Sequence, residues 1–221
     1  MKQQIQFRDL IIGAIAVAII FLSSCKKDKE EDNKVTEEIQ NILPQEYIDS
    51  LTAQGLELHD GNTPPVINGI YDFEPINDYD NSNYFHVGQS ARDAKIKIAN
   101  QAGTSADVFI KGWIDLNIPD TSSAQIIAGT GNNFTVYAQA HGGSPVYTYD
   151  YVLTGTYSSG GIQNMKFAFV MIDNGGNITA ASTGTIRIFH DHDNNASTAS
   201  VFRSMLPAND TDRPAGSAKQ N

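Results

Sequence analysis

The chain has 221 residues, and its 15 Lys and Arg side chains are outnumbered by 25 Asp and Glu side chains, giving a formal net charge of −10. Proteins that bind nucleic acid need a basic surface to neutralise phosphates, so this balance argues against a nucleic-acid partner. Hydrophobic residues make up 40% of the chain and there is one cysteine, which predicts a packed core without a disulfide framework or a CxxC site.

The N-terminus has the features of an export signal. Lys2 and Arg8 accompany an apolar run over residues 10–22, which is too short to span a bilayer but has the length of a signal-peptide core. The run ends in the motif LSSC, whose last residue is Cys25, and this motif resembles the lipobox of bacterial lipoproteins. The resemblance implies that residues 1–24 are removed and that Cys25 is acylated, which would anchor the chain to a membrane.

The residues that follow Cys25 predict a tether over residues 25–43, because its first part is strongly charged and lacks apolar side chains. Lys26, next to the cysteine, and the acidic cluster within residues 28–32 resemble the sorting and surface-export signals of Bacteroidota-type lipoproteins. The resemblance implies a lipid-anchored protein of the outer membrane, at either its periplasmic or its cell-surface face.

One short helical region is expected before the strands begin. Within residues 36–55, Thr36 suits an N-cap, Pro44 suits a first helical turn and Gly55 suits a left-handed stop. We place the folded domain at residues 44–206. The small, polar residues 207–221 predict a disordered tail.

From residue 66 onward the apolar side chains alternate with polar ones, which predicts strands. Nine segments are strand candidates: residues 66–73, 83–87, 94–99, 106–116, 124–129, 133–140, 145–157, 162–173 and 183–191. Several connections between them are hairpin-sized, and no helix-length pattern separates them, so an antiparallel meander is expected rather than parallel βαβ units.

The expected fold class is therefore all-β. A long meander leaves two exposed edges, and closure into a barrel of about eight strands removes them. A two-sheet β-sandwich is the alternative. Both faces of the segment 162–173 are apolar, which predicts a central strand.

Aromatic side chains share faces of three predicted strands and are the candidate ligand-binding residues. They are Phe109, Trp113, Tyr147, Tyr149, Tyr151, Phe167 and Phe169. Pointing into a barrel, they would line an apolar interior with a few hydroxyl groups to orient a ligand. Pointing outward they would suit a glycan or a protein partner, and packed together they would simply form core or cross-strand pairs.

Asp191, Asp193 and Asn195 alternate like the first ligands of a calcium loop, and calcium is the candidate cofactor of this segment. The glycine and glutamate of an EF-hand are absent, and a turn rich in side-chain hydrogen bonds is the alternative. No GxSxG nucleophile motif is present. We expect a protein that is not an enzyme.

The segment Asn68-Gly69-Ile70-Tyr71 is similar to the Gly-x-Trp signature of lipocalins and other calycins, with Tyr71 in place of Trp. The resemblance implies a barrel whose floor Tyr71 closes, with Arg187 of the last strand packed over it. The layout of helix, strand and meander also resembles lipocalin-like lipoproteins of the Bacteroidota type. This implies a binding module for a small apolar or amphipathic ligand. The alternative is a surface adhesion or accessory subunit that binds glycan or another envelope protein.

Overall fold

A computed structural model describes residues 35–112, 120–142 and 145–202, and the side chains of residues 120–124 are not described. Cys25, most of the predicted tether, Trp113 and the predicted tail lie outside this range. Residues 35–42 are helical, followed by α2 (Gln45–Ala53). The strands are β1 (Asn62–Thr63), β2 (Gly69–Phe73), β3 (Pro75–Asp80), β4 (Ala94–Ala102), β5 (Ser105–Lys111), β6 (Asp120–Thr130), β7 (Asn133–Gly142), β8 (Tyr147–Ser158), β9 (Gly161–Asp173), β10 (Ile186–Asp191) and β11 (Asn195–Ser197).

The strands form one hydrogen-bonded path in the order β2-β4-β5-β6-β7-β8-β9-β10-β3, and this confirms the all-β class. From β4 to β10 each strand pairs antiparallel with the next one along the chain, as expected for a meander. The short β1 pairs with β6 in parallel, so the sheet as a whole is mixed.

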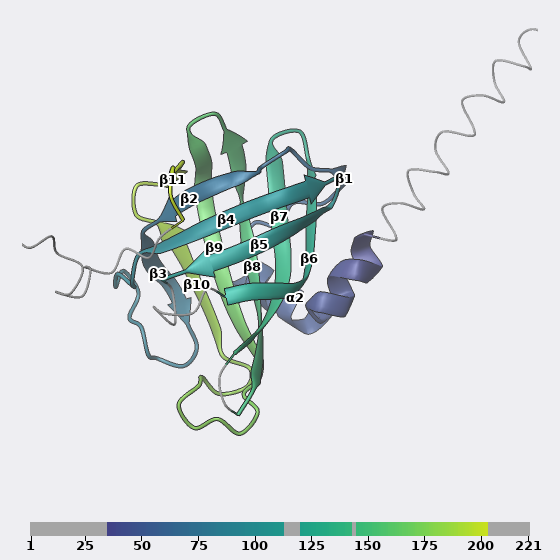
Figure 1. Cartoon of the computed structure of the whole chain (residues 1–221). Coiled ribbons are helices and arrows are strands. Elements are labelled where there is room, and N and C mark those ends of the chain that lie inside the picture. The colour runs from purple at the N-terminus through teal and green to yellow at the C-terminus, as the bar shows by residue number, and fades with distance from the viewer. Residues whose placement is uncertain (1–34, 113–119, 143–144, 203–221) are drawn as a thin grey trace, which may run out of the picture.

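The path bends so that β2, β4 and β5 cross in front of the longer strands β6 to β10 (Figure 1). The strand β6 connects the two parts, because it pairs with β5 through only two residue pairs and with β7 along most of its length. The main hydrophobic core lies between the two parts and contains residues from both.

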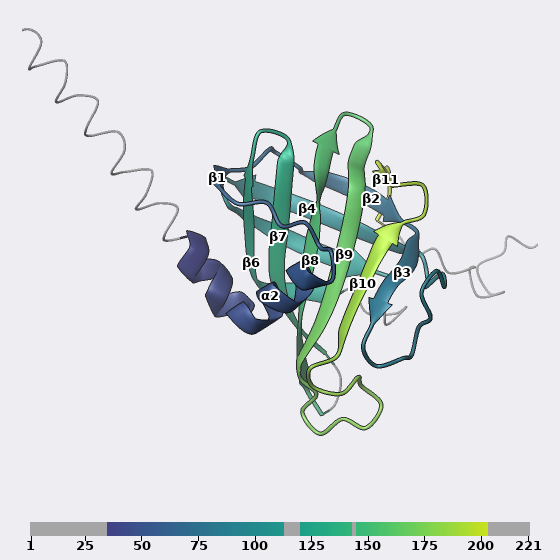
Figure 2. The ribbon, with the colours of Figure 1, turned by 180° about the vertical axis from the view of Figure 1, so that it is seen from behind.

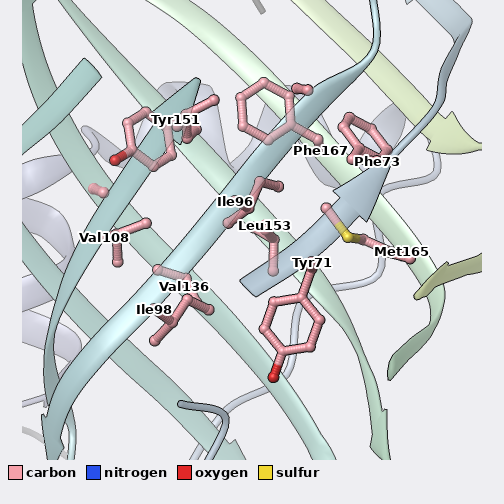
Figure 3. Close-up of a cluster of buried hydrophobic side chains, with 14 of the residues drawn as sticks. Tyr71, Phe73, Ile96, Ile98, Val108, Val136, Tyr151, Leu153, Met165 and Phe167 are labelled. Atoms are coloured by element: carbon pink, nitrogen blue, oxygen red, sulfur yellow. The ribbon is translucent and has the colours of Figure 1, made fainter. Parts of the chain in front are cut away.

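Aromatic rings fill the centre of this core. Tyr151 stacks on Phe167 with ring centroids 5.8 Å apart, and Phe73 of β2 lies 5.9 Å from the same Phe167 ring. Figure 3 shows these three rings together with Ile96 and Leu153 between strands of both parts. All five side chains are buried, so the middle of the molecule is packed rather than hollow.

The helical segments cover the outer face of the large strands (Figure 2). Leu43, Leu51 and Leu56 are fully buried there against side chains of β6 to β10, which explains why β9 is apolar on both faces. Ile39 is buried as well, so the packed structure begins before residue 44, within the segment assigned above to the tether. In the described part of the chain, neither helical segment is both long and apolar enough to span a membrane.

One predicted strand is wrong, and three strands, β1, β3 and β11, were not predicted. Residues 83–87 form a turn-rich connection instead of a strand, and β3 at Pro75–Asp80 pairs with β10, at the opposite end of the strand path from β2. The backbone N–H groups of Tyr84 and Phe85 donate to the Asp80 carboxylate, so they are not available to a neighbouring strand.

Only Glu74 separates β2 from β3, and the chain changes direction there, because β2 pairs with β4 while β3 pairs with β10. The two ends of the strand path are therefore consecutive in the sequence. Buried Asp191 holds this bend: its Oδ2 accepts a hydrogen bond from the Glu74 N–H at 3.0 Å. The backbone N–H of His192 donates to the Glu74 carbonyl at 2.9 Å. The end of β10 therefore fixes the corner from which β2 and β3 diverge.

Close packing explains the Gly69-Ile70-Tyr71 motif. The Tyr71 ring folds back over Gly69, and its buried hydroxyl donates to the Ile67 carbonyl at 2.8 Å. A Cβ atom on Gly69 would lie 2.9 Å from the Tyr71 hydroxyl oxygen. Only glycine leaves room for the ring in this position.

Gly69→Ala is therefore expected to lower the free energy of unfolding by about 1–3 kcal/mol, because the added methyl displaces a buried ring. Gly160→Ala is the matched control, since the nearest atom to its added Cβ is 4.0 Å away. Urea denaturation of both variants measures the difference. Equal stability of the two variants would contradict this account of the motif.

Candidate functional site

A pocket of about 760 Å³ lies at the end of the large strands. Two connections form its walls, residues 81–93 between β3 and β4 and residues 174–185 between β9 and β10, and both lie toward the lower end of the molecule in Figures 1 and 2. The lining residues are Tyr84, Phe85, Gln89, Ser90, Ala91, Arg92, Tyr147, Phe169, Met171, Thr179, Ala180, Ala181 and Arg187. Its volume falls within the range of small-molecule sites in proteins.

The first wall is held by Asp80, at the end of β3. One carboxylate oxygen accepts hydrogen bonds from the Ser82 hydroxyl and backbone N–H, and the other accepts the backbone N–H groups of Tyr84 and Phe85. Burial by itself would raise the pKa of the Asp80 carboxyl, but these hydrogen bonds and the charge of Arg187 outweigh it and hold the pKa below its usual range. Asp80 therefore stays ionised and orders the wall.

The far end of the same connection folds back along β3. The Gly88 N–H donates to the Asn77 carbonyl at 2.8 Å, and the Asn77 N–H donates to the Gln89 carbonyl at 2.9 Å. The Ala91 N–H donates to the Pro75 carbonyl at 2.8 Å. Backbone pairing thus fixes the segment that carries the polar lining residues.

The second wall is built around Asn177, which is almost fully buried. Its side-chain oxygen accepts hydrogen bonds from both the N–H and the hydroxyl of Thr179, and its side-chain nitrogen donates to the Pro145 carbonyl at 3.3 Å. This arrangement ties the 174–185 connection to Pro145, which lies just before β8. It places the small side chains of Ala180 and Ala181 on the pocket, which leaves room for a ligand.

Arg187 of β10 lies where the two walls meet the sheet. Its guanidinium carbon is 5.1 Å from the centroid of the Tyr84 ring, 5.5 Å from that of Phe85 and 5.7 Å from that of Phe169. Its Nε donates to Asp80 at 3.2 Å and its Nη2 to the Ser82 hydroxyl at 3.2 Å. Cation–π attraction and the ion pair together hold the guanidinium in one place.

The predicted ligand-binding aromatics have three different positions. Tyr147 and Phe169 line the pocket. Tyr149, Tyr151 and Phe167 are buried in the core beneath it, where the Tyr149 and Phe169 ring centroids are 5.3 Å apart.

Phe109 lies on the opposite face of β5 from the core residues Val108 and Ile110, with the Lys97 ammonium 5.5 Å from its ring centroid. It therefore takes no part in the pocket. Trp113 lies outside the described residues. Arg187 packs over the three pocket rings instead of over Tyr71, whose neighbours are at the β2–β4 side of the core.

The acidic segment after β10 forms a hydrogen-bonded turn. The Asn195 N–H donates both to Asp191 at 3.1 Å and to Asp193 at 3.0 Å, and the other oxygen of Asp191 accepts the Glu74 N–H. Burial, followed by the neighbouring Asp193, raises the pKa of Asp191. Within the described ranges, no group of three or more His, Cys, Asp or Glu side chains is placed to hold a metal ion.

Asp191→Ala is expected to lower the free energy of unfolding by about 2 kcal/mol, because it leaves the Glu74 N–H without its acceptor at the corner between β2 and β3. Exposed Asp193→Ala is the matched control and should cost much less. We expect calcium addition to leave the melting temperature of the native chain unchanged. A calcium-dependent rise that Asp191→Ala abolishes would instead establish a calcium site.

Sequence reasoning missed the residues of the two connecting segments, above all Tyr84, Phe85 and Arg92. The available signal is the aromatic pair inside residues 83–87, whose composition favours a strand. Nothing in the sequence indicated that residues 81–93 and 174–185 would meet, because 80 residues separate them.

Exposed apolar side chains surround the pocket. Tyr84 is 71% exposed, Val87 79%, Val146 64% and Ile178 98%, and all four belong to segments that form or adjoin its walls. Exposed apolar side chains gathered at one place mark binding surfaces more often than scattered ones do.

Models of protein families, curated proteins and solved structures were compared with the chain, and none of the three comparisons found a match.

Proposed function

We propose that this chain is a lipid-anchored protein of the outer membrane, acylated at Cys25, that binds a small amphipathic molecule and catalyses no reaction. The observation that carries the proposal is the pocket of about 760 Å³, whose floor of Phe169 and Met171 is apolar and whose rim offers Gln89, Ser90 and Thr179. The lining of this pocket combines polar and apolar side chains, and such a mixture suits an amphipathic molecule. The ligand would occupy this end pocket, since aromatic side chains fill the centre of the core.

We also propose that the bent sheet closes into a lipocalin-like barrel at the corner around Glu74. The strand path begins with β2 and ends with β3, and one residue separates these strands in the chain. Closure of this kind would remove both free edges of the meander. The pocket would then be the open end of the barrel.

Binding of N-phenyl-1-naphthylamine, a neutral dye that fluoresces in apolar surroundings, tests the proposed function. Ala180→Trp would fill the pocket from its second wall, and we expect it to weaken dye binding by at least about tenfold, the equivalent of 1.4 kcal/mol of lost contact. Ala102→Trp on the exposed end of β4 is the matched control and should leave binding unchanged. Absence of dye binding by the native chain would refute a small-molecule function for this pocket.

The alternative function is that of a surface adhesion or accessory subunit that binds glycan or another envelope protein. The observation in its favour is the exposure of Tyr84, Val87 and Ile178 around the pocket. Cross-linking in intact cells would separate the two functions. Loss of a partner in Ile178→Gln but not in Ala180→Trp would favour the adhesion role.

A further inference from the structure

We propose that the ligand of this pocket carries a negatively charged oxygen group, such as a carboxylate or a phosphate, and that Arg187 binds this group. The inference rests on the proposed function and adds to it the charge of the ligand. It follows from the geometry of one arginine and from the distribution of charge around the pocket.

The charge of the pocket is opposite to that of the protein. The formal net charge of the chain is −10, yet the described lining residues include Arg92 and Arg187 and no Asp or Glu. Among the described residues, Asp80 is the acid in contact with Arg187. Its carboxylate has no exposed surface and is already bonded to the guanidinium. A positive site on an acidic protein would attract an anion locally while the rest of the surface repels it.

One edge of the Arg187 guanidinium remains available to a ligand. Asp80 and Ser82 accept from Nε and Nη2, while no described residue accepts a hydrogen bond from Nη1. The side chain is 15% exposed and belongs to the pocket lining. A partly desolvated guanidinium binds carboxylate and phosphate oxygens strongly, because charge-assisted hydrogen bonds gain strength where water is excluded.

The guanidinium is also fixed before any ligand arrives. Asp80 is itself held by backbone N–H groups of Tyr84 and Phe85, whose rings pack on Arg187. A ligand would therefore meet a donor that loses little conformational freedom on binding. The apolar floor of Phe169 and Met171 lies beside it, which suits a molecule with one anionic end and an apolar body.

The test compares two dyes with the same ring system, the neutral N-phenyl-1-naphthylamine and the anionic 1-anilinonaphthalene-8-sulfonate. We expect Arg187→Gln to weaken binding of the sulfonate about tenfold or more, as for a lost hydrogen bond to a charged group, and to leave the neutral dye within about twofold. Arg92→Gln, at an exposed position, should weaken the sulfonate by a smaller factor. Lys97→Gln removes one positive charge on the outer face of β4 and serves as the control.

Arg187→Gln leaves buried Asp80 without its cationic partner, so the double variant Asp80→Asn/Arg187→Gln is measured beside it. The same selective loss of sulfonate binding in the double variant, together with a smaller loss in Arg92→Gln, would support the inference. Equal binding of both dyes by all variants would overturn the inference and leave the proposed function standing. Failure of the native chain to bind either dye would refute the proposed function itself.

Displacement of the neutral dye by dodecanoate, dodecyl phosphate and dodecanol then identifies the anion. We expect the carboxylate or the phosphate to displace the dye at concentrations at least about tenfold lower than the alcohol. That advantage should disappear in Arg187→Gln. An alcohol as effective as both anions would contradict the role of Arg187.

Discussion

Phe167→Ala is expected to lower the free energy of unfolding by about 3–5 kcal/mol, the range for an aromatic side chain removed from a packed core. Phe167 is 2% exposed, and its ring contacts both Tyr151 of β8 and Phe73 of β2. The substitution would open a cavity between the two parts of the sheet, which the surrounding side chains can fill only in part. Urea denaturation measures the loss.

Phe109→Ala removes the same side chain from the half-buried outer face of β5 and is the matched control. We expect it to cost about 1 kcal/mol, since much of its surface is already in water. The neutral dye should bind both variants with nearly native affinity, because Phe167 lies below the pocket floor instead of in it. If Phe167→Ala instead kept the native stability but lost dye binding, Phe167 would be a ligand-binding residue and not a core residue.

Asp150→Asn is expected to stabilise the protein at neutral pH. Asp150 is fully buried on the outer face of β8; its Oδ1 accepts a hydrogen bond from Gln139 at 3.0 Å, and no described residue donates to its Oδ2. Burial raises the pKa of this carboxyl to about 7, although the Gln139 hydrogen bond acts in the opposite direction. Asparagine has almost the same volume and carries no charge.

The raised pKa gives a definite pH dependence. The Asp150 carboxyl ionises at about pH 4 in the unfolded chain and at about pH 7 in the folded chain. Between these two pH values the folded state binds one proton more than the unfolded state, so the free energy of unfolding falls as the pH rises. The full contribution at pH 8 is on the order of 4 kcal/mol, because each unit of pKa shift corresponds to about 1.4 kcal/mol. Below pH 4 both states are protonated, and this contribution vanishes.

Urea denaturation of the native chain and of Asp150→Asn at several pH values from 4 to 8.5 measures the effect. Subtracting one free energy of unfolding from the other at each pH removes the contributions of the other acidic residues. We expect the variant to gain stability over the native chain progressively across this range. Exposed Asp60→Asn is the control and should follow the native chain. A constant difference at all pH values would show that the carboxyl does not titrate in this window.

The pattern of apolar residues was sufficient to predict the all-β class and most of the strands. Segments such as residues 133–140 and 162–173 are long and strongly patterned, so their extended form depends little on distant parts of the chain. The short helical region and its stop at Gly55 were also predictable, because Gly55 adopts a positive φ of 84° that favours glycine.

The sequence did not reveal β3 or the true role of residues 83–87. The strand Pro75–Asp80 is rich in polar residues, and it becomes a strand because β10 pairs with it. Residues 83–87 contain good strand formers, but Asp80 binds two of their backbone N–H groups and turns them into a wall of the pocket. Local propensity was overruled in both cases by partners distant in the chain or by a single carboxylate.

The sequence by itself determined most of the strand pattern, the acidic character and the predicted lipid-anchor motif, since each of these depends on neighbouring residues alone. Only the tertiary structure decided which aromatic side chains face the core and which face the pocket, and it brought Arg187, Tyr84 and Ala180 to one place. The alternation along a strand shows that its two faces differ, but which face is inside depends on how the sheet bends and on what covers it. In this protein the change of direction at Glu74 and the helices over the outer face determine which side chains of the strands are buried in which core.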